Sequence, residues 1–130
     1  MTMRRTLFAL CGLLGMLLAC ATPRQETEIR EDLLRQAGFV AKPANTPERI
    51  QMMRSMPPNT FMQGLRGNET VFLYADPKVC GCLYVGTEAQ FLRYKQEALQ
   101  RQLVDEQTLD PQLHRAASWR WGAWDPGWIY

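Results

Sequence analysis

The chain has very little histidine and no long apolar run, and both shortages reduce the range of functions that it can have. His114 is the one histidine in 130 residues, so a zinc site or a Ser-His-Asp arrangement would depend on that single side chain. The longest apolar run, Leu7–Leu18, is too short for a membrane-spanning helix, which needs about 20 apolar residues. No internal repeat, phosphate-binding loop, nucleophile elbow or paired-carboxylate motif is visible. The sequence therefore predicts no catalytic activity.

The first twenty residues form a secretory signal. Arg4 and Arg5 give it a positive start, the apolar run follows, and Ala19 stands just before Cys20. Leu17-Leu18-Ala19-Cys20 resembles the lipobox of bacterial lipoproteins, in which the cysteine thiol takes a diacylglyceryl group, the signal is cut before it and the new amino terminus is acylated. The resemblance implies that Cys20 begins the mature chain and anchors it in the lipid bilayer through its acyl chains.

The residue after the cysteine indicates which of the two membranes holds the protein. Ala21 stands where inner-membrane lipoproteins often carry Asp, so the same resemblance implies the outer membrane, with the domain on its periplasmic face. The alternative is an ordinary signal peptide cut after Ala19, which would leave a free thiol at Cys20.

Removal of the signal changes the composition. It leaves 111 residues, enough for one small domain. Arg4 and Arg5 leave with the signal, so the mature chain has 13 basic residues against 13 acidic ones. This balance argues against nucleic acid as a partner, because binding to phosphates needs a net basic face. Cys11 is also removed, which leaves Cys80 and Cys82 as the pair available for redox or metal chemistry in the oxidising envelope.

Hydrophobic spacing and capping residues predict the elements of the mature chain. Ile29, Leu33, Leu34 and Ala37 share one face of a helix over residues 25–37, which either packs on its own domain or lies on the membrane surface. A connector over 41–46 leads to a second helix that begins after Thr46 and ends near residue 55, before two prolines. Strands over 60–65 and 69–75 form a hairpin about a turn at 66–68.

The remaining elements complete a small α+β domain. A turn over 76–78 precedes a third strand over 79–85, and Thr87 with Gln90 forms a capping box for a helix to about residue 102. Residues 110–115 indicate a short polar helix. The predicted fold class is α+β, a three-stranded antiparallel sheet with helices packed on one side. We divide the chain into a signal peptide (1–19), the lipidated cysteine with the first helix and connector (20–45), an α+β core (46–104) and a polar helix with a Trp-rich tail (105–130).

The third strand lies within a motif, Ala75-Asp76-Pro77-Lys78-Val79-Cys80-Gly81-Cys82-Leu83-Tyr84-Val85-Gly86. With this motif the mature region resembles a family of small proteobacterial lipoproteins, and the similarity runs from about residue 38 to residue 95. The resemblance supports the envelope address and the fold. It implies no ligand, cofactor or catalytic residue, because none is attached to that family.

Cys80 and Cys82 are the main candidates for chemistry. In an extended strand both thiols point to one face beside Tyr84, and their α-carbons lie about 6.6 Å apart, near the upper limit for a disulfide. A bridge therefore needs a bend, which Gly81 permits. A disulfide that closes so small a ring constrains the unfolded chain little, and it is readily reduced. A structural disulfide, a metal site and a redox role all remain open for the pair.

Copper is the cofactor that a metal site here would take, since thiolates and thioethers are soft ligands that suit Cu(I). Four methionines could assist the cysteines: Met52, Met53, Met56 and Met62. Methionines at helical spacing are, however, typical of core packing, and two cysteines supply only half of the ligands of a four-cysteine zinc site.

Two further features lie near the carboxy terminus. We expect His114 at the surface, with a nucleophilic pair between it and Cys80 or Cys82 as the alternative. All four tryptophans are in the tail: Trp119, Trp121, Trp124 and Trp128. Their rigid, amphipathic rings suit a protein interface, and the competing interpretation is that the tail folds back and seals a bare face of the sheet.

These observations favour an outer-membrane lipoprotein with a small periplasmic interaction or structural domain. We expect it to need no cofactor, to catalyse no reaction, and to contact an envelope protein as well as the bilayer. The alternative is a thiol-dependent protein that binds Cu(I) or acts in redox chemistry through Cys80 and Cys82.

Overall fold

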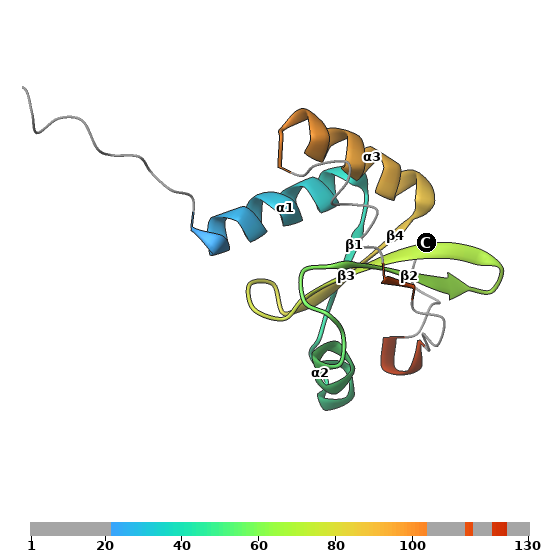
Figure 1. Cartoon of the computed structure of the whole chain (residues 1–130). Coiled ribbons are helices and arrows are strands. Elements are labelled where there is room, and N and C mark those ends of the chain that lie inside the picture. Colours follow the sequence, from blue (N-terminus) through green and yellow to red (C-terminus); the bar gives the residue numbers. More distant parts are fainter. Residues whose placement is uncertain (1–21, 104–113, 116–120, 125–130) are drawn as a thin grey trace, which may run out of the picture.

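A computed structural model describes residues 22–103, 114–115 and 121–124, with backbone alone for 114 and 115 (Figure 1). The chain folds, in order, into α1 (Pro23–Ala37), β1 (Val40–Pro43), α2 (Pro47–Arg54), β2 (Phe61–Arg66), β3 (Glu69–Asp76), β4 (Cys82–Thr87), α3 (Glu88–Gln100), β5 (His114–Arg115) and the 3-10 helix η1 (Gly122–Trp124). Strands β1 to β4 form an antiparallel sheet in the order β1-β4-β3-β2, and β5 adds to β2 in parallel. No helix within these ranges has the length and apolar character needed to cross a membrane.

Threonine caps explain where the three helices begin. The hydroxyl groups of Thr22, Thr46 and Thr87 each accept the backbone N–H three residues further on, which satisfies a donor that the first turn leaves free. Gly38 ends α1 in the left-handed conformation, with φ of 99°. The three predicted helices are thus confirmed, with ends that differ by no more than two residues.

The sheet is buried on both faces, and each face has its own core. Under α1 and α3 lies a largely aromatic core of Leu33, Leu34, Ala37, Phe39, Phe61, Phe72, Tyr74, Cys82, Tyr84, Phe91, Tyr94 and Ala98. The opposite face packs against α2 and η1 through Met53, Met56, Met62, Val71, Leu73, Ala75, Leu83, Val85 and Trp124. The α+β class is confirmed, and so is packing of the first helix on its own domain.

The expectation that all helices cover one side of the sheet is wrong, because α2 covers the face opposite to α1 and α3 (Figure 1). The continuous apolar stretches of β3 and β4 give the physical reason. Residues 71–76 and 82–86 are all buried, whereas a sheet with one bare face would alternate apolar and polar residues.

The sheet also has more strands than the three predicted, which correspond to β2, β3 and β4. The predicted connector over 41–46 begins with β1, a four-residue edge strand in which Pro43 pairs with Cys82. Proline lacks an N–H group and is tolerated at such an edge, so its presence did not indicate a strand. His114 and Arg115 form β5 instead of the predicted polar helix, because their backbone pairs with Met62 and Gln63. Residues 110–113 lie outside the described residues.

The tail closes the α2 face of the sheet. Trp124 is fully buried, and two cations from β1 and α2 hold the carbonyl groups around it. Lys42 Nζ donates to the Trp124 carbonyl oxygen at 2.8 Å, and Arg49 Nε donates to that of Ala123 at 2.9 Å. Trp121 Nε1 donates to the Leu65 carbonyl oxygen at 3.0 Å. The interpretation that the tail folds back onto the sheet is therefore confirmed for residues 121–124.

Candidate functional site

The loop between β3 and β4 carries Cys80 and is organised by one buried carboxylate. Asp76, at the end of β3, is fully buried and accepts three backbone N–H groups of the loop. The donors are Lys78 at 2.9 Å, Val79 at 3.1 Å and Cys80 at 2.8 Å. The turn predicted at 76–78 is confirmed in part, because Asp76 still belongs to β3 and the turn runs over 77–80, and β4 begins at Cys82 rather than at Val79. The carboxylate takes the N–H groups that a strand would have needed for its ladder.

Cys80 and Cys82 form a disulfide across this junction. The expectation of one extended strand with both thiols on the same face is wrong, because Cys80 lies in the loop and only Cys82 lies in β4. Gly81 makes the bend with φ of 62°, and the α-carbons approach to 5.1 Å, within the usual range for a disulfide. Cys82 points into the aromatic core on the same side as Tyr84, as predicted.

The two cysteines differ in exposure. Cys80 is exposed, whereas Cys82 is only 2% exposed. An external nucleophile can therefore reach the sulfur of Cys80 much more easily than that of Cys82.

A second carboxyl group meets Asp76 from helix α1. Glu31 is 3% exposed, and burial together with the hydrogen bond to Asp76 and its negative charge raises the pKa of Glu31 to about 7. Burial by itself would raise the pKa of Asp76, but the hydrogen bond from Glu31 and the three loop N–H groups outweigh it and lower that pKa. Glu31 Oε1 receives no hydrogen bond from the donors of the described residues, as expected if this carboxyl carries the proton that the pair shares.

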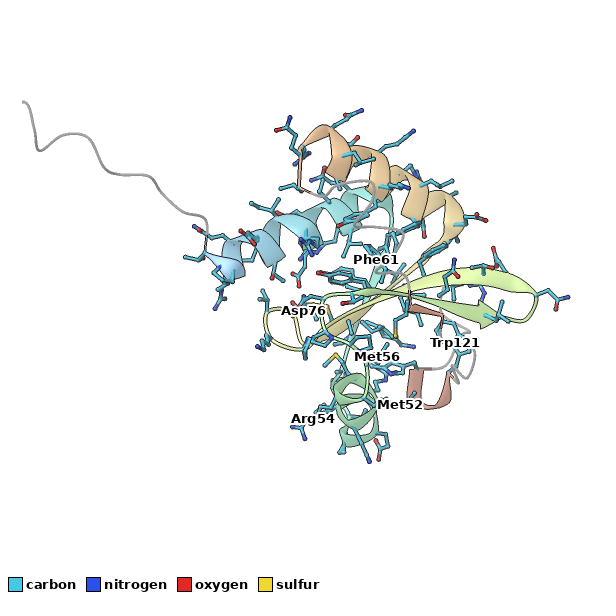
Figure 2. The ribbon with its side chains drawn as sticks, viewed as in Figure 1. Met52, Arg54, Met56, Phe61, Asp76 and Trp121 are labelled. Carbon is cyan, nitrogen blue, oxygen red and sulfur yellow. A yellow bond between two sulfur atoms is a disulfide. The ribbon has the colours of Figure 1, made fainter. Side chains whose placement is uncertain are left out.

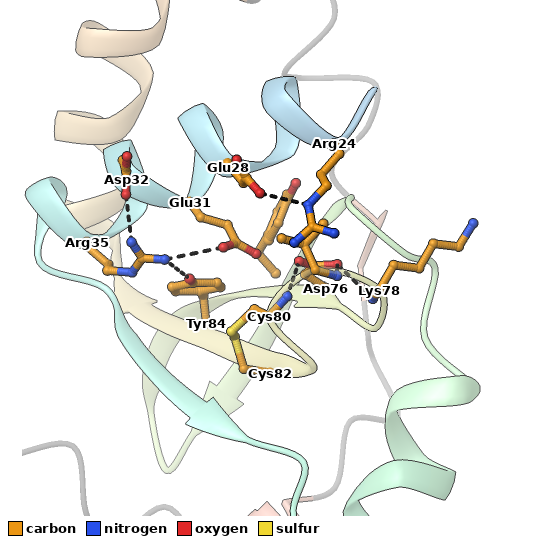
Figure 3. A network of polar contacts seen from close by, with 12 residues as sticks. Arg24, Glu28, Glu31, Asp32, Arg35, Asp76, Lys78, Cys80, Cys82 and Tyr84 are labelled. Carbon is orange, nitrogen blue, oxygen red and sulfur yellow. Dashed lines mark hydrogen bonds and ion pairs between the residues drawn. A yellow bond between two sulfur atoms is a disulfide. The ribbon is translucent and has the colours of Figure 1, made fainter. Parts of the chain in front are cut away.

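Arg35 and Tyr84 complete the network (Figure 3). Arg35 Nη2 donates to Glu31 Oε2 at 3.3 Å and to the Tyr84 hydroxyl at 3.2 Å, and Arg35 Nη1 donates to Asp32 Oδ1 at 2.6 Å. Tyr84 is fully buried in β4, two residues after Cys82. Helix α1 is thus bonded to β4 and, through Asp76, to the loop that carries Cys80.

A groove of about 340 Å³ lies beside this network, between the start of α1 and the loop. Its walls come from both segments and from the turn before β2: Pro23, Arg24, Thr27, Asn59, Asp76, Lys78 and Val79. The two residues that precede Cys80 are therefore part of the wall, so a segment seated in the groove would lie close to the disulfide.

No protein-family model matches the chain, and no curated protein or solved structure is significantly similar to it. The lipobox at Cys20, which lies outside the described residues, and the resemblance carried by residues 75–86 remain predictions from the sequence.

The structure does not bring the methionines to the cysteines. Figure 2 shows Met52 and Met56 near Trp121, on the side of the sheet opposite to Phe61. Met53, Met56 and Met62 belong to the core on the α2 face, while Cys82 belongs to the core on the other face. The described residues contain no group of three or more His, Cys, Asp or Glu that could hold a metal ion.

The remaining candidates are only partly described. Trp124 is fully buried, so its ring serves the core rather than an exposed interface, and Trp121 is half-buried against the same core. Trp119 and Trp128 lie outside the described residues. For His114 the structure gives the backbone alone, in β5.

The sequence did not identify Glu31, Arg35 and Asp76 as parts of a site. Asp76 carried a signal, because Asp before Pro commonly accepts the N–H groups of a following turn. Glu31 carried none, since an acidic residue in an amphipathic helix is usually exposed.

Proposed function

We propose that this is an outer-membrane lipoprotein, anchored through acyl chains on Cys20, whose periplasmic domain is a non-catalytic interaction module. The observation that carries the proposal is the lipobox-like motif Leu17-Leu18-Ala19-Cys20, which stands directly before the folded domain. Helix α1 is capped by Thr22 and begins at Pro23. Only Ala21 lies between the cap and Cys20, and two residues span at most about 7 Å. The domain is therefore held directly at the bilayer surface.

This short tether also determines which part of the domain lies near the membrane. The first turn of α1 is the part closest to the anchor in sequence, and Pro23, Arg24 and Thr27 of that turn line the groove. A partner that uses the groove must therefore reach it close to the bilayer. An envelope protein embedded in, or attached to, the same membrane fits this position best. A freely diffusing partner would have less access.

The anchor is tested by lipid labelling in a Gram-negative bacterium. The full-length protein should incorporate radiolabelled palmitate and fractionate with the outer membrane. Cys20→Ser should abolish both, because its hydroxyl does not replace the nucleophilic thiol. Cys11→Ser is the matched control, since that cysteine lies inside the signal and its loss should leave labelling unchanged. A labelled Cys20→Ser protein would contradict the proposal.

The interaction is tested by site-specific photocrosslinking in intact cells. A crosslinking residue in place of Lys78, in the groove wall, should capture an envelope protein. The same residue in place of Glu97, which is exposed on α3 away from the groove, is the control and should capture none. Adducts of equal yield from both positions, or none from Lys78, would contradict a partner at the groove.

A further inference from the structure

We propose that the Cys80–Cys82 disulfide exchanges with a dithiol of a partner protein, and that Cys80 provides the sulfur that the partner attacks. The unequal exposure of the two cysteines is the first support. Cys80 is exposed in the loop, and Cys82 is 2% exposed within the aromatic core. Disulfide exchange requires a thiolate to approach one sulfur of the bond directly. Only the Cys80 side is open to such an approach.

The second support is that the loop does not depend on the disulfide for its conformation. Asp76 already holds the N–H groups of Lys78, Val79 and Cys80. The carbonyl oxygen of Gly81 accepts the N–H of Ala44 at 2.9 Å, which fixes the other end of the bend. A disulfide between residues two apart removes little entropy from the unfolded chain, so it adds little to stability. The bond can therefore open while the fold remains.

The surroundings of Cys80 provide the third support. Lys78 and Val79, which precede it, form part of the groove wall, opposite the first turn of α1. A peptide segment that carries the attacking thiolate has a place to bind there. Lys78 is exposed two residues before Cys80, and its positive charge favours the approach of a thiolate over that of a neutral thiol.

The exchange has two balanced steps. A thiolate of the partner attacks Sγ of Cys80; a bond forms between these two sulfurs, the Cys80–Cys82 bond breaks, and Cys82 Sγ leaves as a thiolate that takes up a proton. The second thiol of the partner then loses its proton and attacks the partner's own sulfur in the mixed disulfide, which releases Cys80. The partner dithiol is oxidised to a disulfide, and the Cys80–Cys82 pair is reduced to two thiols.

The test uses the full lipidated protein in detergent micelles, with a synthetic peptide that contains two cysteines separated by two residues. The oxidised protein is incubated with excess reduced peptide without oxygen, quenched with acid, alkylated and weighed by mass spectrometry. We expect the protein to gain two alkyl groups, an equal amount of peptide to lose two hydrogens, and the circular dichroism spectrum to remain unchanged. A disulfide that persists unless the chain is first unfolded in urea, or a reduced protein that loses its fold, would show a purely structural role and overturn the proposal.

Two single variants test the assignment of the attacked sulfur. Exchange is reversible, so the free thiol of Cys80 in Cys82→Ser should form a mixed disulfide with the oxidised peptide. Cys80→Ser, which retains only the buried thiol, should form it at least about tenfold more slowly. Circular dichroism checks that both variants are folded, and intact mass checks that Cys20 is blocked by lipid. Equal rates would overturn the role of Cys80. An unblocked Cys20 would contradict the proposed anchor, whereas the two exchange rates test the role of Cys80, and neither reading depends on a cellular partner.

Discussion

The paired carboxyl groups of Glu31 and Asp76 give the site its dependence on pH. Asp76 stays ionised because it is the acceptor for the loop, whereas Glu31 is favoured in its protonated form as the donor to Asp76. Above about pH 7 both groups carry charge, and Arg35 is ion-paired with Glu31. The link between α1 and the loop is therefore strongest in mildly acidic solution.

Glu31→Gln should remove this pH dependence. The pKa of Glu31 is raised in the folded chain, so the folded state binds the proton more tightly than the unfolded state does. The free energy of unfolding of the native protein should therefore fall as pH rises from about 4.5 to about 7, by up to about 3 kcal/mol. The glutamine keeps a neutral donor for Asp76, and its variant should be the more stable protein at pH 8. Urea unfolding at a series of pH values measures this.

The control for that series is Glu28→Gln, which removes an exposed carboxylate from the same helix. Its stability should follow the native curve within about 0.5 kcal/mol. A Glu31→Gln curve that keeps the native slope between pH 4.5 and 7 would show that Glu31 is ionised throughout.

Asp76→Asn should destabilise the chain by about 2–4 kcal/mol at pH 7. The amide nitrogen cannot accept the N–H groups that both carboxylate oxygens now accept, and it leaves buried donors without partners. Because the folded pKa of Asp76 is lowered, its contribution is complete above about pH 3.8 and is lost as pH falls below that value. Asp32→Asn, at an exposed carboxylate of α1, should cost less than about 1 kcal/mol in the same urea titration. Equal losses in the two variants would contradict the role given to Asp76.

Among the elements, the helix caps and the β2–β3 hairpin were predicted correctly, whereas the pairings of β1 and β5 were not predicted. Thr22, Thr46 and Thr87 fix helix starts through bonds to residues three positions away, so the sequence carries that information locally. Strands β1 and β5 depend on distant partners, Val40–Pro43 on β4 and His114–Arg115 on β2. The disulfide and its bend at Gly81 were among the predicted options, but the loop position of Cys80 follows from the capture of backbone groups by Asp76.

The hydrogen bond from Lys42 to the Trp124 carbonyl oxygen in η1 gives a prediction for the tail. Lys42→Met keeps the apolar stem of the side chain but removes the buried donor to the Trp124 carbonyl oxygen. We expect a loss of about 1.5–3 kcal/mol, because a buried acceptor then lacks a charged partner. Lys78→Met, at an exposed position, is the control and should change the free energy of unfolding by less than about 0.5 kcal/mol. Thermal unfolding of both variants measures the difference. Equal stability of Lys42→Met and the native protein would show that the hydrogen bond from Lys42 does not stabilise the tail.

For the molecule as a whole, a core on both faces of the sheet explains why Trp124 is buried and why Trp121 packs beside it. The α2 face of the sheet packs against side chains from this eight-residue helix and the residues that follow it, Met53 and Met56, and also against Trp124 of the tail. Sealing of a sheet face by the tail was one of the two interpretations of the sequence, but the sequence did not indicate that a helix shares that face. The continuous apolar run at residues 71–75 was the signal in the sequence for a sheet buried on both faces, but it did not show which element covers the second face.

The most direct test of the proposed lipid anchor is the intact mass of the protein extracted from isolated outer membranes. We expect a chain that begins at Cys20 and carries diacylglycerol on its thiol and an acyl chain on its amino group. A chain that begins at Ala21 or at Met1, or an unmodified Cys20, would contradict the central claim that the domain is held by lipid at the membrane surface.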